Sequence, residues 1–226
     1  MCKAIIFDLD DTLISEKEYI KSGYKAVSKY IEEKYRLDKE KTYVQLNILF
    51  SESSREVFNR FFEINNIKYE KEDIINLVNC YRNHIPTIKF YDDVIPTITE
   101  LKKRRIKTGI ITDGYKETQK RKLQALEAEK IFDEIIVTDE LGKEYWKPNP
   151  KAFELMREKL NVRYNEMIYV GDNPEKDFYI SKIYPITCVR VMRDEAVYDD
   201  REYKENIKEK IRVDNLNKLL DENIIT

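Results

Sequence analysis

Short runs rich in apolar residues recur along this sequence, and they constrain the fold more than any other feature. They lack the strict polar alternation of a half-exposed strand, so they are typical of strands buried on both faces of a parallel sheet. Between them lie helical patterns, such as Phe153, Met156 and Leu160. Runs separated by helices predict βαβ units and an α/β fold. The runs lie at residues 4–7, 108–111, 135–137 and 167–170, with two further candidates at 186–191 and 211–213.

Residues 15–91 interrupt this alternation. Ile20, Tyr24, Val27 and Ile31 repeat at helical spacing, and similar patterns follow further along the segment. A stretch of this length is not a loop, because structureless loops beyond about 15 residues are uncommon in compact domains. The sequence therefore predicts an all-helical insert at 15–91, between the first strand and the rest of the sheet. The α/β core is then formed by residues 1–14 and 92–226.

Composition excludes several classes of protein. The chain has 226 residues, and its net charge of -2 provides no basic excess for nucleic acid. No stretch approaches the roughly 20 apolar residues of a membrane helix, and the apolar start at 4–7 is too short for a signal sequence. Cys2, Cys80 and Cys188 have no CxxC spacing, which favours a reducing compartment. We therefore expect a cytoplasmic protein that binds neither nucleic acid nor membrane. The charged residues 193–209 are expected to form a solvated excursion.

Asp8 and Asp10 directly follow the first apolar run. Both leave the carboxyl end of a predicted strand, and this edge of an open α/β sheet is where ligands bind. Crowded carboxylates repel each other unless a cation or a proton lies between them. The pair therefore indicates a hard metal ion, a proton-transfer role, or both.

Three further motifs fall where the same edge of the sheet is expected. Thr112-Asp113-Gly114 follows the second strand, and Lys147-Pro148-Asn149-Pro150 precedes a helix. Gly171-Asp172-Asn173-Pro174-Glu175-Lys176-Asp177 follows the fourth run, and its Asn-Pro pair predicts a helix through Phe178 that carries Asp177 in its first turn. Each motif alone has an ordinary structural explanation. Four in this order on one edge indicate a functional site.

With these motifs, the chain resembles the haloacid dehalogenase superfamily, and within it the phosphatases with a helical cap. The resemblance covers nearly the whole sequence. It implies a doubly wound, Rossmann-like parallel sheet as the core, and it implies that residues 15–91 form the cap domain. The motifs are specific for the superfamily but not for a substrate.

The resemblance implies roles for the acidic residues. Asp8 is expected to be the nucleophile and a metal ligand, forming an aspartyl-phosphate. Asp10 is expected to protonate the leaving alcohol, and its backbone carbonyl to bind the metal. This assignment requires Asp8 to stay ionised beside Mg²⁺ while Asp10 carries a proton. Asp172 supplies the second carboxylate for Mg²⁺. Thr12 is expected to brace the turn that aims Asp10, and Asp11 is expected to be exposed.

The remaining motif residues are expected to bind the phosphoryl group. Thr112 would donate a hydrogen bond to a phosphoryl oxygen, together with the backbone N–H groups of Asp113 and Gly114. Lys147 would neutralise charge on Asp8 and on the transferring group. For Asp177 two interpretations stay open: it ligates the metal through water, or it orients Lys147.

The expected activity is hydrolysis of a small phosphorylated metabolite, such as a sugar phosphate, a nucleotide or a phospho-acid. Asp10 argues against dehalogenation, since a halide leaves without a proton. A sugar phosphomutase of the same superfamily is the alternative enzyme, and a receiver-like phospho-acceptor module is the alternative outside enzymes. Candidate substrate contacts include Glu16, although an exposed helix face is its simpler interpretation. The substrate, the choice between Mg²⁺ and Mn²⁺, and the choice between monomer and homodimer stay open.

Overall fold

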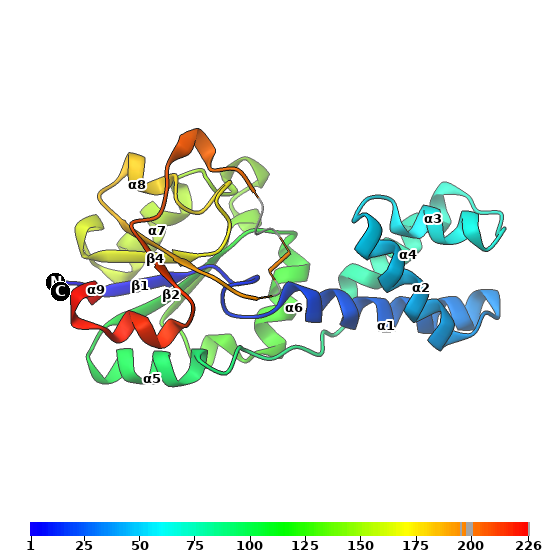
Figure 1. Cartoon of the computed structure of the whole chain (residues 1–226), viewed down its shortest axis with the longest axis horizontal. Helices are drawn as coiled ribbons and strands as arrows, with labels where there is room; N and C mark the ends of the chain where they lie inside the picture. The colour runs from blue at the N-terminus through cyan, green and yellow to red at the C-terminus, as the bar shows by residue number, and fades with distance from the viewer. Residues whose placement is uncertain (195, 198–200, 226) are drawn as a thin grey trace. The chain divides into compact units, whose positions relative to one another are not determined.

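The structure is a computed structural model that describes residues 1–194, 196–197 and 201–225. It divides into two compact units (Figure 1). The first combines Met1–Lys17 with Ile88–Thr226, and the second is Glu18–Thr87. These boundaries lie a few residues inside the predicted segment 15–91.

The first unit contains one parallel sheet in the order β3-β2-β1-β4-β5-β6. From β1 the chain first builds outward through β2 and β3, and then returns to the other side of β1 with β4. The strand order thus reverses beside β1, which makes this a doubly wound sheet with a switch point. The predicted α/β class is confirmed. The strands are β1 (Ala4–Phe7), β2 (Lys107–Thr112), β3 (Glu134–Val137), β4 (Met167–Gly171), β5 (Thr187–Val191) and β6 (Ile211–Val213).

Helices cover both faces of the sheet. Ile5 and Phe7 of β1 belong to the apolar core that includes α5 and α6, whereas Ile6 belongs to the core that includes α7 and α8 (Figure 1). This burial on two faces is the physical reason why β1 is apolar at every position. The α-helices of this unit are α5 (Val94–Lys103), α6 (Lys116–Ala125), α7 (Lys151–Leu160), α8 (Ile180–Ile183) and α9 (Glu222–Ile225). Short 3₁₀ turns lie at η1 (Ala128–Lys130), η2 (Thr138–Glu140), η3 (Lys143–Tyr145), η4 (Tyr164–Glu166), η5 (Lys204–Asn206) and η6 (Leu216–Leu220).

One local prediction for this unit is wrong, and a second holds for most of the described residues that it covers. The segment after Asn173 forms turns, and the next helix begins only at Ile180. The Asp177 backbone N–H donates to the Asn173 carbonyl at 3.0 Å, and the Asp177 carboxylate accepts the Asn173 N–H at 2.9 Å, so a single closed turn forms and no helix follows directly. The segment 193–209 is not wholly solvated, because the Arg193 side chain is buried against Asp93. Positions 195 and 198–200 of that segment lie outside the described residues.

The second unit consists of α-helices around an apolar core that includes Ile31, Leu46, Phe61, Phe62 and Leu77. Side chains satisfy free backbone donors where two of these helices begin. Asp38 accepts the Lys41 N–H at 2.8 Å, and Glu70 and Asp73 form a capping box. Among the helices of the described residues, none is both long and apolar enough to cross a membrane. The helices are α1 (Glu16–Tyr35), α2 (Lys39–Glu52), α3 (Val57–Ile64) and α4 (Lys71–Asn83).

Candidate active site

The functional motifs meet at the carboxyl ends of β1, β2 and β4. Asp8 follows β1, and its backbone N–H donates to the Val170 carbonyl of β4 at 2.8 Å, which extends the parallel register by one residue. Asp172 follows β4, and Thr112 ends β2. Since β1 lies between β2 and β4, these side chains gather at the switch point of the sheet. The structure therefore brings together residues that the sequence separates by more than 160 positions.

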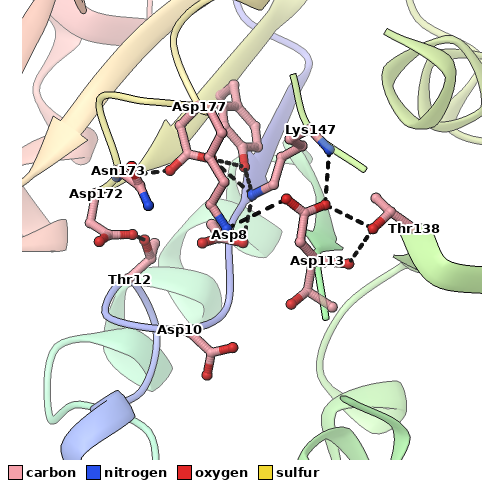
Figure 2. Close-up of polar contacts among 12 residues, drawn as sticks. Asp8, Asp10, Thr12, Asp113, Thr138, Lys147, Asp172, Asn173 and Asp177 are labelled. Carbon is pink, nitrogen blue, oxygen red and sulfur yellow. Dashed lines mark hydrogen bonds and ion pairs between the residues drawn. The ribbon is translucent and has the colours of Figure 1, made fainter. Parts of the chain in front are cut away.

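Lys147 is the buried cation of the site. Its ammonium donates to Asp8 Oδ1 at 2.7 Å, to Asp177 Oδ1 at 2.8 Å and to the Tyr169 hydroxyl at 2.7 Å (Figure 2). These three acceptors match the three N–H bonds of an ammonium group. Its side chain has no exposed surface, yet the carboxylates of Asp177 and Asp8 outweigh burial and raise its pKa. Lys147 therefore stays charged, and Asp177 contacts it directly.

Three carboxylates form a cluster beside this lysine. Asp8, Asp172 and Asp177 each offer an oxygen within 4.8 Å of the others. Burial raises the pKa of Asp8 to about 6, and it raises the pKa of Asp172 well above the usual range, with Asp177 and Asp8 adding repulsion. Asp172 Oδ1 accepts a hydrogen bond from Thr12 at 3.3 Å. The cluster has more negative charge than Lys147 balances, and its oxygen donors fit a hard divalent cation such as Mg²⁺.

Asp10 lies to one side of this cluster (Figure 2). Its carboxylate is bound by residues of helix α6. Lys122 Nζ donates to its Oδ1 at 2.7 Å, and Gln119 Nε2 donates to its Oδ2 at 2.9 Å. Burial favours a raised pKa, but Lys122 and Gln119 outweigh it and lower the pKa of Asp10. Burial thus raises the pKa of Asp8, and Lys122 and Gln119 lower the pKa of Asp10, so both pKa values shift in the directions opposite to those expected. The expectation for Asp8 depended on a neighbouring Mg²⁺, and that for Asp10 did not include Lys122.

The turn after β1 is fixed by buried hydrogen bonds. Asp11 was expected to be exposed, but it is only 1% exposed. Its carboxylate accepts the Glu16 N–H at 2.8 Å and the Val197 N–H at 2.7 Å, so burial satisfies two backbone donors. Arg193 also fastens this turn, donating to the Thr12 carbonyl at 2.8 Å. The chain that follows β5 therefore supports the segment carrying Asp10.

The turn after β2 contributes hydroxyl and backbone groups. Thr112 Oγ1 accepts a hydrogen bond from Gln119 at 3.0 Å. The Asp113 carboxylate accepts from the Thr138 hydroxyl at 2.7 Å and from the Lys147 backbone N–H at 3.0 Å, so it holds neighbouring loops together. Gly114 has a φ of 129°, a conformation that residues with a side chain disfavour. Its backbone lines a cavity over the site.

A cavity of about 340 Å³ opens over these groups. It also includes residues without a predicted catalytic role, notably Lys176, which approaches Asp113 Oδ2 at 3.4 Å. Glu16 lines it as well, and burial, together with Asp10, raises the pKa of this carboxyl to about 8. The residues lining the cavity are Asp8, Asp10, Glu16, Asp113, Gly114, Trp146, Lys147, Asp172, Asn173, Lys176 and Arg201.

Three residues that bind side chains of the site are not part of the sequence motifs: Gln119, Lys122 and Tyr169. Tyr169 is part of an apolar strand, and Lys122 is one of several basic residues in α6. The only available signal was the three-residue spacing of Gln119 and Lys122, which places them on one face of a helix that follows a functional turn.

The site combines aspartates, a buried lysine and a threonine at the switch point of a parallel sheet. This combination is typical of a site for phosphoryl transfer. Residues 5–191 match the family described as haloacid dehalogenase-like hydrolase. The chain belongs to this family. The expected superfamily is thereby confirmed, and the similar proteins confirm the expected phosphatase class.

Similar proteins include named phosphatases. The glyceraldehyde 3-phosphate phosphatase of Methanocaldococcus jannaschii is 30% identical over 207 residues, covering 89% of each chain. The pyrophosphatase PpaX of Bacillus mycoides is 27% identical over 175 residues, covering 75% of this chain and 74% of its own. The crystal structure of a HAD phosphatase from Thermococcus onnurineus superposes with a TM-score of 0.61 at 26% identity, covering 96% of this chain and 95% of the other.

Proposed function

We propose that this protein is a Mg²⁺-dependent phosphatase that hydrolyses monoesters of small metabolites through a phosphorylated Asp8. The observation that carries the proposal is the environment of the Asp8 carboxylate. One oxygen is bound by the buried ammonium of Lys147 at 2.7 Å, and the residue lines a cavity large enough for a small phosphate ester. The second cluster carboxylate, Asp172, lies beside it.

Two displacements at phosphorus complete the reaction. In the first, an Asp8 oxygen forms a bond to phosphorus while the ester P–O bond breaks, and Asp10 gives its proton to the departing alkoxide. A phosphate dianion adds negative charge beside Asp10, which favours the protonated acid in the substrate complex. In the second, water attacks the phosphorus while Asp10 takes a proton from it. Cleavage of the acyl phosphate then regenerates Asp8 and releases inorganic phosphate.

The other motif residues hold the transferring group. The Thr112 hydroxyl and the backbone N–H groups of Asp113 and Gly114 supply neutral donors, and Lys147 supplies positive charge. Asp177 orients Lys147, which is supported by their 2.8 Å contact. Thr12 links the turn after β1 to Asp172. These contacts position groups on three strand ends around one phosphoryl site.

Asp8 and Asp172, with the backbone carbonyl of Asp10, are the groups we expect to hold Mg²⁺. The geometry of the cluster supports this assignment, because the buried carboxylates of Asp8 and Asp172 offer oxygens within 4.8 Å of each other. When bound, Mg²⁺ would offset the repulsion between the nucleophile and the phosphate dianion.

The substrate class follows from the relatives and from the cavity. The similar proteins are named for glyceraldehyde 3-phosphate and pyrophosphate, both small phosphorylated compounds. We assign the helical unit, Glu18–Thr87, the role of a cap that selects among such substrates. The three cysteines are all free, which supports a reducing compartment such as the cytoplasm.

The experiment is a phosphate-release assay on sugar phosphates, nucleotides and phospho-acids, with and without Mg²⁺. Asp8→Asn is expected to abolish release and keep the fold, because an amide does not displace the ester. Asp92→Asn is the matched control, since that side chain is 94% exposed. Activity that survives in Asp8→Asn rules out the nucleophile assignment. Conversion of a sugar phosphate to an isomer without release identifies a phosphomutase.

A further inference from the structure

Two side chains of α6 hold the two oxygens of Asp10 separately. Lys122 binds Oδ1 at 2.7 Å and Gln119 binds Oδ2 at 2.9 Å. Both are nearly buried, with 3% of Lys122 and 2% of Gln119 exposed. Because they are three residues apart, they project from the same face of α6. Because both carboxylate oxygens of Asp10 are hydrogen-bonded, both of its side-chain torsion angles are fixed.

Gln119 also connects Asp10 to the turn after β2. Its Nε2 donates to Thr112 Oγ1 at 3.0 Å and to the Asp113 backbone carbonyl. Its own Oε1 is buried without a hydrogen-bond partner in the described structure. Leaving a buried acceptor unsatisfied is costly. The orientation of the Gln119 amide therefore favours hydrogen bonds from its Nε2 group over one to its Oε1. These hydrogen bonds link the Asp10 carboxylate to Thr112.

We propose that Lys122 and Gln119 are positioning residues that aim the Asp10 carboxyl group at the leaving-group oxygen. This inference rests on the proposed phosphatase function. A general acid acts only within hydrogen-bond reach of the atom it protonates. Each carboxyl oxygen keeps a second lone pair, so binding by α6 leaves Asp10 able to carry a proton. Asp10 also lines the cavity, which gives its carboxyl group access to substrate.

The test compares an alkyl phosphate with p-nitrophenyl phosphate. An alkoxide needs a proton to depart, whereas p-nitrophenolate leaves without one. In Lys122→Met, kcat/KM for the alkyl ester should fall about 10- to 100-fold, less than the roughly 100- to 10,000-fold that a general acid contributes, because the acid is misaimed and not removed. The value for the aryl ester should stay within about threefold. The value of kcat/KM depends only on the steps up to departure of the leaving group. The later hydrolysis of phospho-Asp8 therefore does not affect it.

Matched variants separate positioning from a purely structural role. Lys120→Met removes a lysine of the same helix that pairs with Glu140 at 2.6 Å and is 48% exposed, and it should leave both substrates unchanged. Lys122→Arg keeps the charge and should restore alkyl hydrolysis in part. Asp10→Asn should show the same selective loss as Lys122→Met.

An equal loss on both substrates in Lys122→Met, or no loss on either, overturns the positioning role. If this variant does not fold, Gln119→Leu provides the same comparison, and an unchanged alkyl-to-aryl ratio in it overturns the proposal. Failure of the proposed function gives a different result: wild-type protein then releases no phosphate from either ester. A third result is an active wild type, an inactive Asp8→Asn and a Lys122→Met that keeps the wild-type ratio of alkyl to aryl hydrolysis. In that case only the positioning inference fails, and the proposed function stands.

Discussion

Lys147 combines catalysis and stability in one side chain. It is fully buried and contacts two buried carboxylates, Asp8 at 2.7 Å and Asp177 at 2.8 Å. A buried ion pair that loses one member leaves an uncompensated charge, and that cost exceeds what the intact pair contributes. Substitution of Lys147 should therefore affect the fold as well as the reaction, although the motif alone suggests a catalytic role.

Lys147→Met should abolish phosphatase activity and lower the free energy of unfolding by about 3–5 kcal/mol. Urea unfolding with and without Asp177→Asn checks the cause. The double variant Lys147→Met, Asp177→Asn should regain part of the stability and none of the activity, because it removes one uncompensated carboxylate. Equal unfolding midpoints for the single and double variants would contradict this explanation.

Single residues also show where sequence interpretation reaches its limit. Asp8 and Asp172 were placed correctly because each directly follows a strand, and a strand end fixes the location of the next side chain. Asp11 was misplaced because its partners, the backbone N–H groups of Glu16 and Val197, cannot be inferred from residue type. Lys122 could not be distinguished from Lys116, Lys120 and Arg121 of the same helix, since only packing decides which of them is buried.

At the scale of elements, local polar contacts decide how helices begin. In α4, Asp73 Oδ2 accepts the Glu70 backbone N–H at 2.9 Å. Its Oδ1 accepts from Lys34 at 2.7 Å and from Tyr35 at 2.8 Å, both in α1. The backbone hydrogen bond, followed by Lys34, lowers the pKa of Asp73 to about 2. One carboxylate thus caps α4 and ties it to α1.

This contact predicts a pH-dependent stability. The pKa of Asp73 is lower in the folded state than in the unfolded state, where it is near 3.9. The ionised carboxylate therefore stabilises the fold at pH values above about 3.9, and this stabilisation is lost as the pH falls toward about 2. Asp73→Asn should therefore be less stable than wild type at pH 6, with a gap that closes between about pH 4 and pH 2. Thermal unfolding across this range measures it, with Glu72→Gln from the same turn as control. A gap that does not change with pH would argue against the ionic contact.

Elements differ in how well the sequence predicts them. The strands were found because burial on both faces makes them continuously apolar. The segment after Asn173 was predicted as a helix because its Asn-Pro start is typical of one. The structure closes one turn there, from the Asp177 N–H to the Asn173 carbonyl, and the Asp177 carboxylate binds Lys147 from a distant part of the chain. Tertiary contacts at the site override the local preference there.

At the scale of the whole molecule, cation binding should be linked to folding. A ligand that binds only the folded chain stabilises it by RT ln(1 + [L]/Kd), about 2.7 kcal/mol at 100 times Kd. Mg²⁺ should therefore raise the unfolding temperature of wild type, and Asp172→Asn should remove most of that shift. Without added Mg²⁺ the same variant should be more stable than wild type, because it removes the burial of a charged group, and the repulsion from Asp177 and Asp8, that together raise the pKa of Asp172.

Calorimetry with and without Mg²⁺ measures both effects. Asp92→Asn serves as the control, since it removes a carboxylate that is 94% exposed. A full Mg²⁺ response in Asp172→Asn would place the cation elsewhere. An Asp172→Asn chain that is less stable without Mg²⁺ would show that the acidic cluster does not repel itself.

The position of β1 in the sheet has a consequence for biosynthesis. β1 leaves the ribosome well before its partners β2 and β4, whose residues follow about 100 to 160 positions later. Lys147, which binds Asp8, lies 139 residues downstream of it. The nascent chain therefore cannot assemble this site until residue 177 has been added, whereas Glu18–Thr87 has its internal contacts available much earlier. Cotranslational folding should begin with the helices and end with catalytic competence.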